Sequence, residues 1–192
     1  TLRDTNITTT SLFNDLNYSS FDTFFDNGVK TNFEISLKNV NTVGNNNPKY
    51  DENPQSELMS SYTYNASLPM IKRNLFSFNT LEPKLSLRLS PNDMKDNKIL
   101  RRRIDINNVF NSNRLSMEDS LEGGESVTLG LNFKKEKVST INDLSEIEEY
   151  IDFKLASVFR LSEEKNIPTN STLNRKQSNI FGQLDFKPIK NI

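Results

Sequence analysis

Residues 101–135 read RRRIDINNVFNSNRLSMEDSLEGGESVTLGLNFKK, and their two halves differ in character. In the second half, from 127 to 133, apolar residues at every other position alternate with small or polar ones. This period of two predicts a β-strand with one apolar face. The first half is rich in Asn and Arg and continues through Gly123-Gly124 without any regular period. The stretch therefore predicts a long polar loop that leads into a two-sided strand.

The composition excludes several classes of protein. The chain of 192 residues contains no Cys and no His, which removes disulfides, the common zinc sites and the nucleophilic schemes that use Cys or His. Its net charge of -1 argues against a dedicated nucleic-acid binder, because phosphate contacts need a basic excess. No run approaches the roughly 18 apolar residues of a membrane-spanning helix. We therefore expect no catalytic residues, no metal and no cofactor, and we predict that the protein is not an enzyme.

Runs with a period of two recur along the chain. In each run, an apolar face is opposed by a face rich in Lys, Glu, Arg, Asp and Asn. The pattern predicts an all-β fold, an antiparallel meander of long strands. The predicted strands are 12–25, 29–38, 58–70, 81–89, 125–135, 150–160 and 179–187.

The connections between these runs alternate in length. Short turns on one side and long loops on the other are typical of outer-membrane barrels, and soluble sandwiches follow no such rule. The pattern therefore predicts part of a large transmembrane outer-membrane β-barrel, with a porin-like channel or a soluble β-sandwich that binds a partner as alternatives. The connections are short at 26–28 and 72–74, intermediate at 136–146, and long at 39–55, 90–122 and 162–178.

The loop and the strand after it also carry a motif. An Asp precedes an Asn-Leu-Phe-like tripeptide, then Asn-Arg-Leu-Ser, then an acidic run that ends in Gly, and finally Gly-Leu within a strand. The matching positions are Asp105, Asn108, Val109, Phe110, Asn113, Arg114, Leu115, Ser116, Asp119, Glu122, Gly123, Gly130 and Leu131. This segment resembles the lipopolysaccharide-assembly family of outer-membrane proteins (LptD, also called OstA). Met117 and Ser120 depart from the family's usual Gly and Arg.

The resemblance implies a function and a set of partners. The family translocates lipopolysaccharide through a barrel into the outer leaflet of the bacterial outer membrane. The implied partners are lipopolysaccharide, a plug lipoprotein, the periplasmic lipopolysaccharide-bridge proteins and outer-membrane lipid, with no nucleic acid. Because the family joins a periplasmic jellyroll to a large barrel, we expect residues 1–192 to be an interior fragment of the C-terminal barrel domain, without the jellyroll and the barrel ends. The Asn- and Lys-rich composition favours an alphaproteobacterial member.

The two faces of the predicted strands indicate how a barrel of this kind is oriented. We expect the Leu-rich faces to contact lipid and the charged faces to line a wet lumen, along which the sugar head of an amphiphile passes. The candidate lumen-facing residues are Lys30, Glu34, Glu82, Lys84, Arg88, Asp152 and Lys154.

Arg101, Arg102 and Arg103 allow three interpretations. Guanidinium groups bind phosphate oxygens in pairs, so the triplet could hold lipid phosphates. We favour the other two interpretations, in which the triplet lies in a solvated loop or forms an ion pair in the lumen with Asp105 or Glu118.

Overall fold

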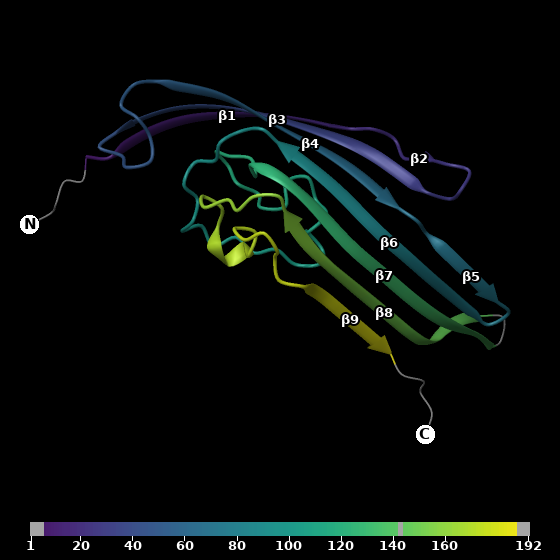
Figure 1. The fold of residues 1–192 in the computed structure, drawn as a ribbon. Coiled ribbons are helices and arrows are strands. Elements are labelled where there is room, and N and C mark those ends of the chain that lie inside the picture. The colour runs from purple at the N-terminus through teal and green to yellow at the C-terminus, as the bar shows by residue number, and fades with distance from the viewer. Residues whose placement is uncertain (1–5, 142–143, 188–192) are drawn as a thin grey trace, which may run out of the picture.

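The computed structural model describes residues 6–141 and 144–187 and shows one antiparallel sheet of 9 strands (Figure 1). Along the sheet the order is β1-β3-β4-β6-β7-β8-β9, with β2 paired to β3 and β5 to β6. The strands are β1 (Thr8–Ser19), β2 (Thr23–Phe24), β3 (Lys30–Asn45), β4 (Gln55–Ser67), β5 (Met70–Asn74), β6 (Ser77–Ser90), β7 (Gly124–Ile141), β8 (Leu144–Arg160) and β9 (Phe181–Lys187), and a 3-10 turn, η1, covers Thr169–Ser171.

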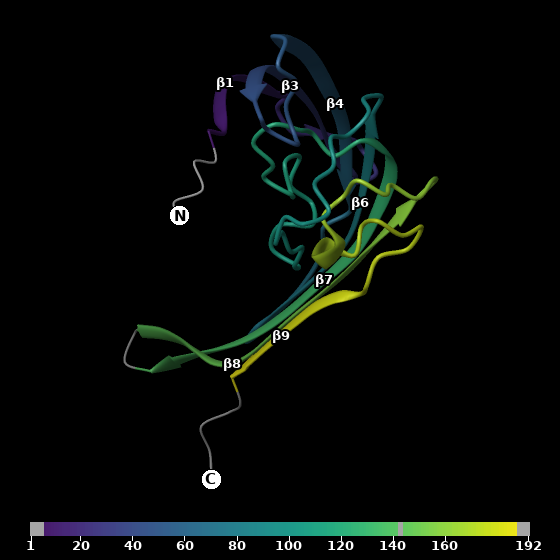
Figure 2. The same ribbon diagram turned by 90° about the vertical axis from the view of Figure 1, so that its left-hand side faces the viewer.

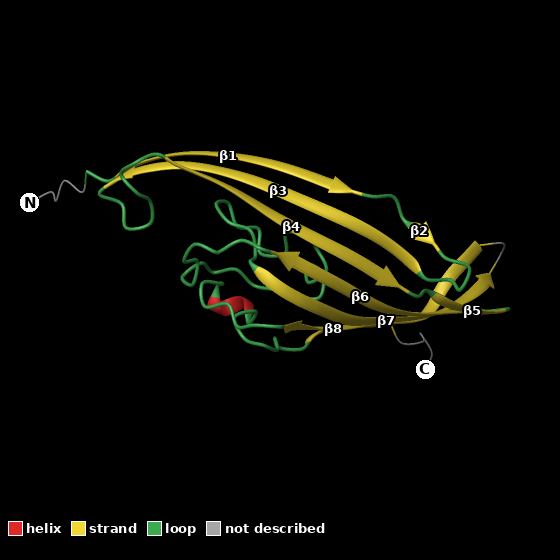
Figure 3. Cartoon of the chain, turned by 45° about the horizontal axis from the view of Figure 1, so that its top comes forward, coloured by secondary structure: helices red, strands yellow, loops and turns green. Residues whose placement is uncertain are grey.

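The predicted all-β antiparallel meander is confirmed. The sheet is strongly curved but open, because its edge strands β1 and β9 do not pair with each other (Figure 2). Figure 3 shows the short connections at one end of the strands and the long loops at the other. In the described part of the chain, no helix has the length and apolarity needed to cross a lipid bilayer.

Strand β3 is longer than predicted, and the expected loop at 39–55 is wrong over its first part. Residues up to Asn45 belong to β3, so the loop covers only 46–54. Asn has low β-propensity, but β3 pairs with β1 on one side and with β4 on the other. Backbone hydrogen bonds from both neighbours outweigh the local preference for a turn. The predicted strand at 12–25 is divided into β1 and β2, because residues 20–22 between them do not belong to a strand.

Two predicted connections are also corrected. Lys72, Arg73 and Asn74 do not form a turn: they belong to β5, which pairs with β6, and the turn lies at Leu75 and Phe76. The described residues of the predicted intermediate connection at 136–146 belong to strands instead, because β7 continues to Ile141 and β8 begins at Leu144. Residues 142–143 of that prediction lie outside the described residues. Both corrections shorten connections at the same end of the sheet, so the alternation is sharper than the sequence indicates.

The strand register collects the apolar positions on the convex face. One row across the sheet consists of Phe33, Tyr64, Leu87, Val127 and Phe159. Of the leucines nearby, Leu87 is 42% exposed and Leu129 48% exposed, so no second layer of the described chain covers them. The sheet therefore presents a bare apolar surface on its outer side.

The concave face is partly covered by the two long loops. Residues 91–123 and 161–180, which we call the cap, lie inside the curve of the sheet (Figure 2). Their apolar side chains pack with one another and with β8 in a cluster of Met94, Ile104, Val109, Leu115, Met117, Ala156, Val158, Ile167 and Leu173. Loops normally lie in solvent, whereas these have a core of their own. The sequence predicted that the whole concave face is wet. This prediction is wrong for the part that the cap covers.

Candidate functional site

The carboxylate of Glu122 lies at the centre of a buried network between the cap and the sheet. Arg114 Nε donates to Glu122 Oε2 at 2.7 Å, and Arg114 Nη2 donates to Oε1 at 2.5 Å. From β8, Arg160 Nη1 donates to the same Oε1 at 2.8 Å. The arginine side chains are 1% exposed and that of Glu122 is 2% exposed. A single carboxylate therefore joins the motif loop to a strand of the sheet.

Arg114 makes further hydrogen bonds that place the loop over β7. Its Nη1 donates to the carbonyl of Val109 at 3.2 Å and to Thr128 Oγ1 at 3.0 Å, and its Nη2 donates to Ser126 Oγ at 3.1 Å. Ser126 and Thr128 are small, so the concave face of β7 leaves room for the guanidinium. The five N–H donors of this buried cation make five hydrogen bonds, as burial of a charge requires.

Arg88 has a different environment from the one predicted. It was expected to line a wet lumen, but it is 7% exposed beneath the cap. Its guanidinium donates to the carbonyl of Asn111 at 2.7 Å and to that of Ser112. The strand register is consistent with the prediction that the Arg88 side chain points inward. The prediction that it contacts water is wrong, because the cap covers this part of the sheet.

The surrounding arginines keep Glu122 ionised. Burial alone would raise the pKa of this carboxyl, but the charge and hydrogen bonds of Arg114, with the charges of Arg88 and Arg160, lower it from 4.5 to about 2. The ionised form is therefore the stable form at neutral pH.

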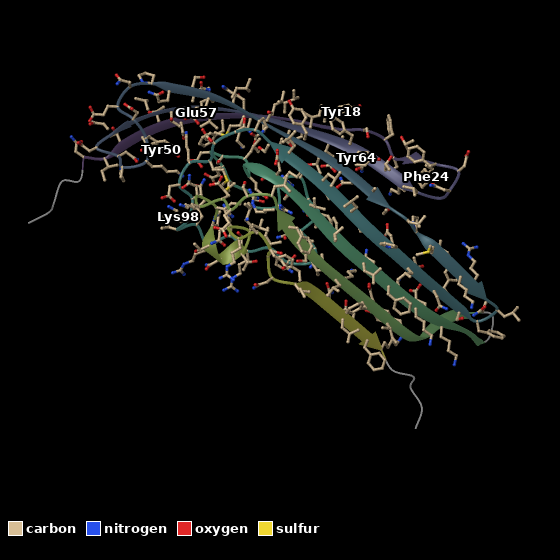
Figure 4. All side chains as sticks on the ribbon, in the orientation of Figure 1. Tyr18, Phe24, Tyr50, Glu57, Tyr64 and Lys98 are labelled. Carbon is tan, nitrogen blue, oxygen red and sulfur yellow. The ribbon has the colours of Figure 1, made fainter. Side chains whose placement is uncertain are left out.

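A second link joins the cap to the loop at 46–54. Asp119 accepts a hydrogen bond from the Tyr50 hydroxyl at 2.7 Å, and its carboxylate lies 2.7 Å from Lys49 Nζ. Burial and the Asp119 carboxylate raise the pKa of Tyr50. Burial acts to raise the pKa of Asp119 as well, but the hydrogen bonds from Lys49 and Tyr50 lower it overall. Figure 4 labels Tyr50 at this loop-bearing end of the sheet, near Glu57 and Lys98.

Gly130 and Phe110, from separate parts of the motif, lie against each other. A Cβ at Gly130 would lie 2.5 Å from Phe110 Cζ and 2.8 Å from its Cε2. The ring therefore occupies the space that any other residue at 130 would need. At Gly123 a Cβ would lie 2.6 Å from the carbonyl oxygen of Asn92, so the chain also passes too closely there for a side chain.

The other motif residues shape the loop itself. Asp105 Oδ1 accepts hydrogen bonds from the N–H groups of Asn107 at 2.8 Å and Asn108 at 3.1 Å, and Asn108 Oδ1 accepts one from the N–H of Asp105 at 2.9 Å. Ser116 has a φ of 46° and donates its hydroxyl to the carbonyl of Asn113 at 3.2 Å. Such side-chain bonds stabilise turns in place of regular structure.

The residues predicted to line a lumen share the concave face. The register aligns Lys30 with Lys84 through Ser67, and Glu82 with Lys154 through Asn132. Below the cap they form a mixed-charge surface, the open zone, in which the ion pairs are Lys30–Asp22 at 2.8 Å, Lys84–Glu82 at 3.4 Å and Lys154–Asp152 at 3.6 Å. A pocket of about 170 Å³ lies where this zone meets Phe110 of the cap. Glu34 and Arg88 align through Thr63 nearer the cap. That the residues predicted to line a lumen do so stays a prediction.

Sequence reasoning missed several residues that hold the cap. Arg160 was not singled out, and neither was Lys38, which is 3% exposed and donates to the carbonyl of Glu118 at 3.0 Å while pairing with Asp15 at 2.7 Å. Each of the two residues alternates with outward-facing neighbours, so the sequence could have placed both on the concave face. It could not have shown which groups they contact. The ion pair considered for Arg101, Arg102 and Arg103 with Asp105 or Glu118 is absent from the described residues. Nor do three or more His, Cys, Asp or Glu side chains within the described residues converge to hold a metal ion.

The fold and the site define an all-β protein whose two-faced sheet carries an internal cap on its polar side. The chain belongs to the LptD family, LPS transport system D, whose family model matches residues 29–192. The match includes β3 to β9 and the whole motif, and it confirms the family that the motif resembles. It also associates the chain with the transport of lipopolysaccharide in general terms. A search of curated proteins finds no match to the chain.

The pKa of Glu122 predicts how the cap responds to acid. A carboxyl whose pKa falls from 4.5 to about 2 on folding contributes stability that is complete above about pH 4.5 and is lost as the pH falls toward 2. We expect pepsin, normalised against an unstructured peptide, to leave the cap of the full-length protein intact at pH 4 and to cut it near pH 2.

The variant Glu122→Gln tests the same interaction without acid. It leaves Arg114 and Arg160 buried without a counter-ion, which costs roughly 3–5 kcal/mol. We expect its cap to be cut to a similar extent at pH 4 and pH 2. An unchanged acid transition in this variant would show that another carboxylate controls docking.

Gly130→Val tests the contact between the two parts of the motif. Val favours a strand, but here its side chain must displace the Phe110 ring, so we expect a loss of about 1–3 kcal/mol in the free energy of unfolding. Gly182→Val on β9 is the matched control, because a Cβ there meets no atom closer than 3.6 Å. When Phe110→Ala is also present, Gly130→Val should lower the free energy of unfolding much less, because there is no ring to displace. Equal losses at positions 130 and 182 would contradict the packing argument.

Proposed function

We propose that this chain forms part of the wall of an outer-membrane β-barrel that carries lipopolysaccharide to the outer leaflet. The single observation that supports this most is the two-faced sheet in a chain of the LptD family. An apolar convex face suits lipid, and a polar concave face suits a hydrated passage. The family's association with the outer membrane supports this location.

The apolar face has about the height of a bilayer. On β6 the outward leucines begin at Leu81 and end at Leu89. This distance is roughly 27 Å along a strand and on the order of 20 Å across the membrane after the usual strand tilt, near the band of about 25 Å in known barrels. An apolar face of this extent fits contact with lipid.

Polar residues limit the apolar face at both ends. At the end with short turns, the outward row contains Lys72, Asn79 and Lys135. At the end with long loops, the outward positions of β3 are Asn39 and Asn41. Headgroups and water would meet these residues on either side of the hydrocarbon layer. A face buried against a protein partner would have no need for polar limits at this spacing.

The open zone of the concave face offers groups to a sugar head. Lys, Glu, Asp and Asn side chains alternate there, and sugar hydroxyls both donate and accept hydrogen bonds. The free edges of β1 and β9 are where further strands of a closed barrel would pair. As partners we propose lipopolysaccharide, a plug lipoprotein and the periplasmic bridge proteins.

The alternatives have weaker support. A soluble sandwich needs a second layer over Leu87 and Leu129, and none of the described residues covers them. A porin-like channel would share the two faces, but the family match favours lipopolysaccharide transport.

Delivery of lipopolysaccharide tests the proposed function. Vesicles that contain the full-length protein and its partners are supplied with lipopolysaccharide from the side of the short turns. We expect it to become accessible to a labelling enzyme on the opposite side, in an amount that depends on the full-length protein. Vesicles that pass small sugars but never expose lipopolysaccharide would support the channel instead.

Substitutions on the two faces test the orientation. Leu87→Arg places a charge on the proposed lipid face and should cost about 2–4 kcal/mol near the middle of the bilayer. Lys84→Gln on the concave face should fold like the wild type. Folding of the full-length protein into vesicles, followed by the change in gel mobility on heating, measures both. If both variants insert equally well, the orientation is wrong.

A further inference from the structure

Many cations of the structure lie in ion pairs, in the sheet and in the cap alike. On the concave face of the sheet, Lys30, Lys84 and Lys154 each lie within an ion pair, and Glu122 neutralises Arg160. On the cap, however, another set of cations has no carboxylate partner among the described residues. This basic patch consists of Arg101, Arg102, Arg103, Lys165, Arg175 and Lys176, all exposed except Arg102, which is half-buried.

The fold of the cap brings these residues together from two loops. The N–H of Asn97 donates to the carbonyl of Asn166 at 2.9 Å, and the N–H of Thr169 donates to the carbonyl of Lys98 at 3.4 Å. Ile104, next to Arg103, and Leu173, close to Arg175, belong to the same buried cluster. The segments that carry the patch therefore belong to one packed unit.

The free charge of the patch is suited to an anion. Binding an anion there breaks no ion pair, and guanidinium groups match phosphate oxygens with two parallel hydrogen bonds. The cap has nine Lys and Arg against eight Asp and Glu, so the excess of positive charge belongs to the patch and not to the cap as a whole. The open zone has paired charges of both signs and suits neutral sugar hydroxyls.

We propose that the basic patch of the cap binds the phosphate groups on the sugar head of lipopolysaccharide. This inference rests on the proposed function, and it adds a chemical requirement: the ligand must be phosphorylated. The packed core beneath the patch supports these side chains from below. The patch would thus select the charged form of the ligand within the passage.

Binding to the full-length protein with its partners in detergent micelles tests the proposal. The ligands are lipopolysaccharide, the same lipopolysaccharide after enzymatic removal of its phosphates, and inorganic phosphate alone. The variant Arg101→Gln/Arg103→Gln removes two exposed cations of the patch. Its matched control, Lys72→Gln/Arg73→Gln, removes two exposed cations from β5, at the other end of the sheet.

We expect the patch variant to bind phosphorylated lipopolysaccharide about tenfold more weakly than the wild type, because two charge-assisted contacts are lost. Its affinity for the dephosphorylated form should be unchanged, and the control variant should match the wild type for both. Added salt should weaken binding of the phosphorylated form to the wild type more than binding to the patch variant.

Other outcomes overturn the proposal in distinguishable ways. Equal binding of both forms of lipopolysaccharide to every variant would reject the patch and leave the proposed function intact. Inorganic phosphate that binds as tightly as lipopolysaccharide would identify a free anion as the ligand. Loss of an acidic protein partner in the patch variant, with lipopolysaccharide binding unchanged, would make the patch a protein interface. A wild-type protein that binds neither form would reject the proposed function as well.

Discussion

The buried carboxylate of Glu122 is the interaction on which the arrangement of this protein depends. A polar loop does not enter the inside of a curved sheet without a reason, because its charged groups lose water there. Glu122 compensates for that loss by accepting hydrogen bonds from Arg114 in the loop and from Arg160 in β8. The motif loop consequently becomes a layer of the structure instead of a strand connection in solvent.

Docking of the cap divides the concave face into two parts with different physical properties. Under the cap, small residues such as Ser126 and Thr128 leave room for buried guanidinium groups, and an apolar cluster joins the two loops to β8. Beyond the cap, the open zone contains paired charges and faces a pocket beside Phe110. The cap also carries the unpaired cations of the basic patch. The concave side thus combines a packed support, a surface of paired charges and, on the cap, a cationic surface.

The convex face follows from a simpler constraint. Side chains alternate across a strand, so any strand with polar residues on the concave side places its other residues outside. With leucine and aromatic residues at those positions, the outer surface is apolar along β6 from Leu81 to Leu89. The membrane argument and the cap argument therefore concern opposite faces of the same strands, and neither requires chemistry beyond packing, charge and hydrogen bonding.

Residue order alone was enough to predict the all-β class, the faces of most strands and the family, because alternation and the motif are local properties of the chain. It misplaced the end of β3 and the turn at 72–74, since pairing with neighbouring strands extended the sheet through residues that locally favour turns. The burial of Arg88 and the contact of Arg160 with Glu122, 38 positions away, arise only when the chain is folded. The same is true of the cap. A period of two shows which face a side chain takes, but the loop that covers this face is positioned by contacts between residues far apart in the chain.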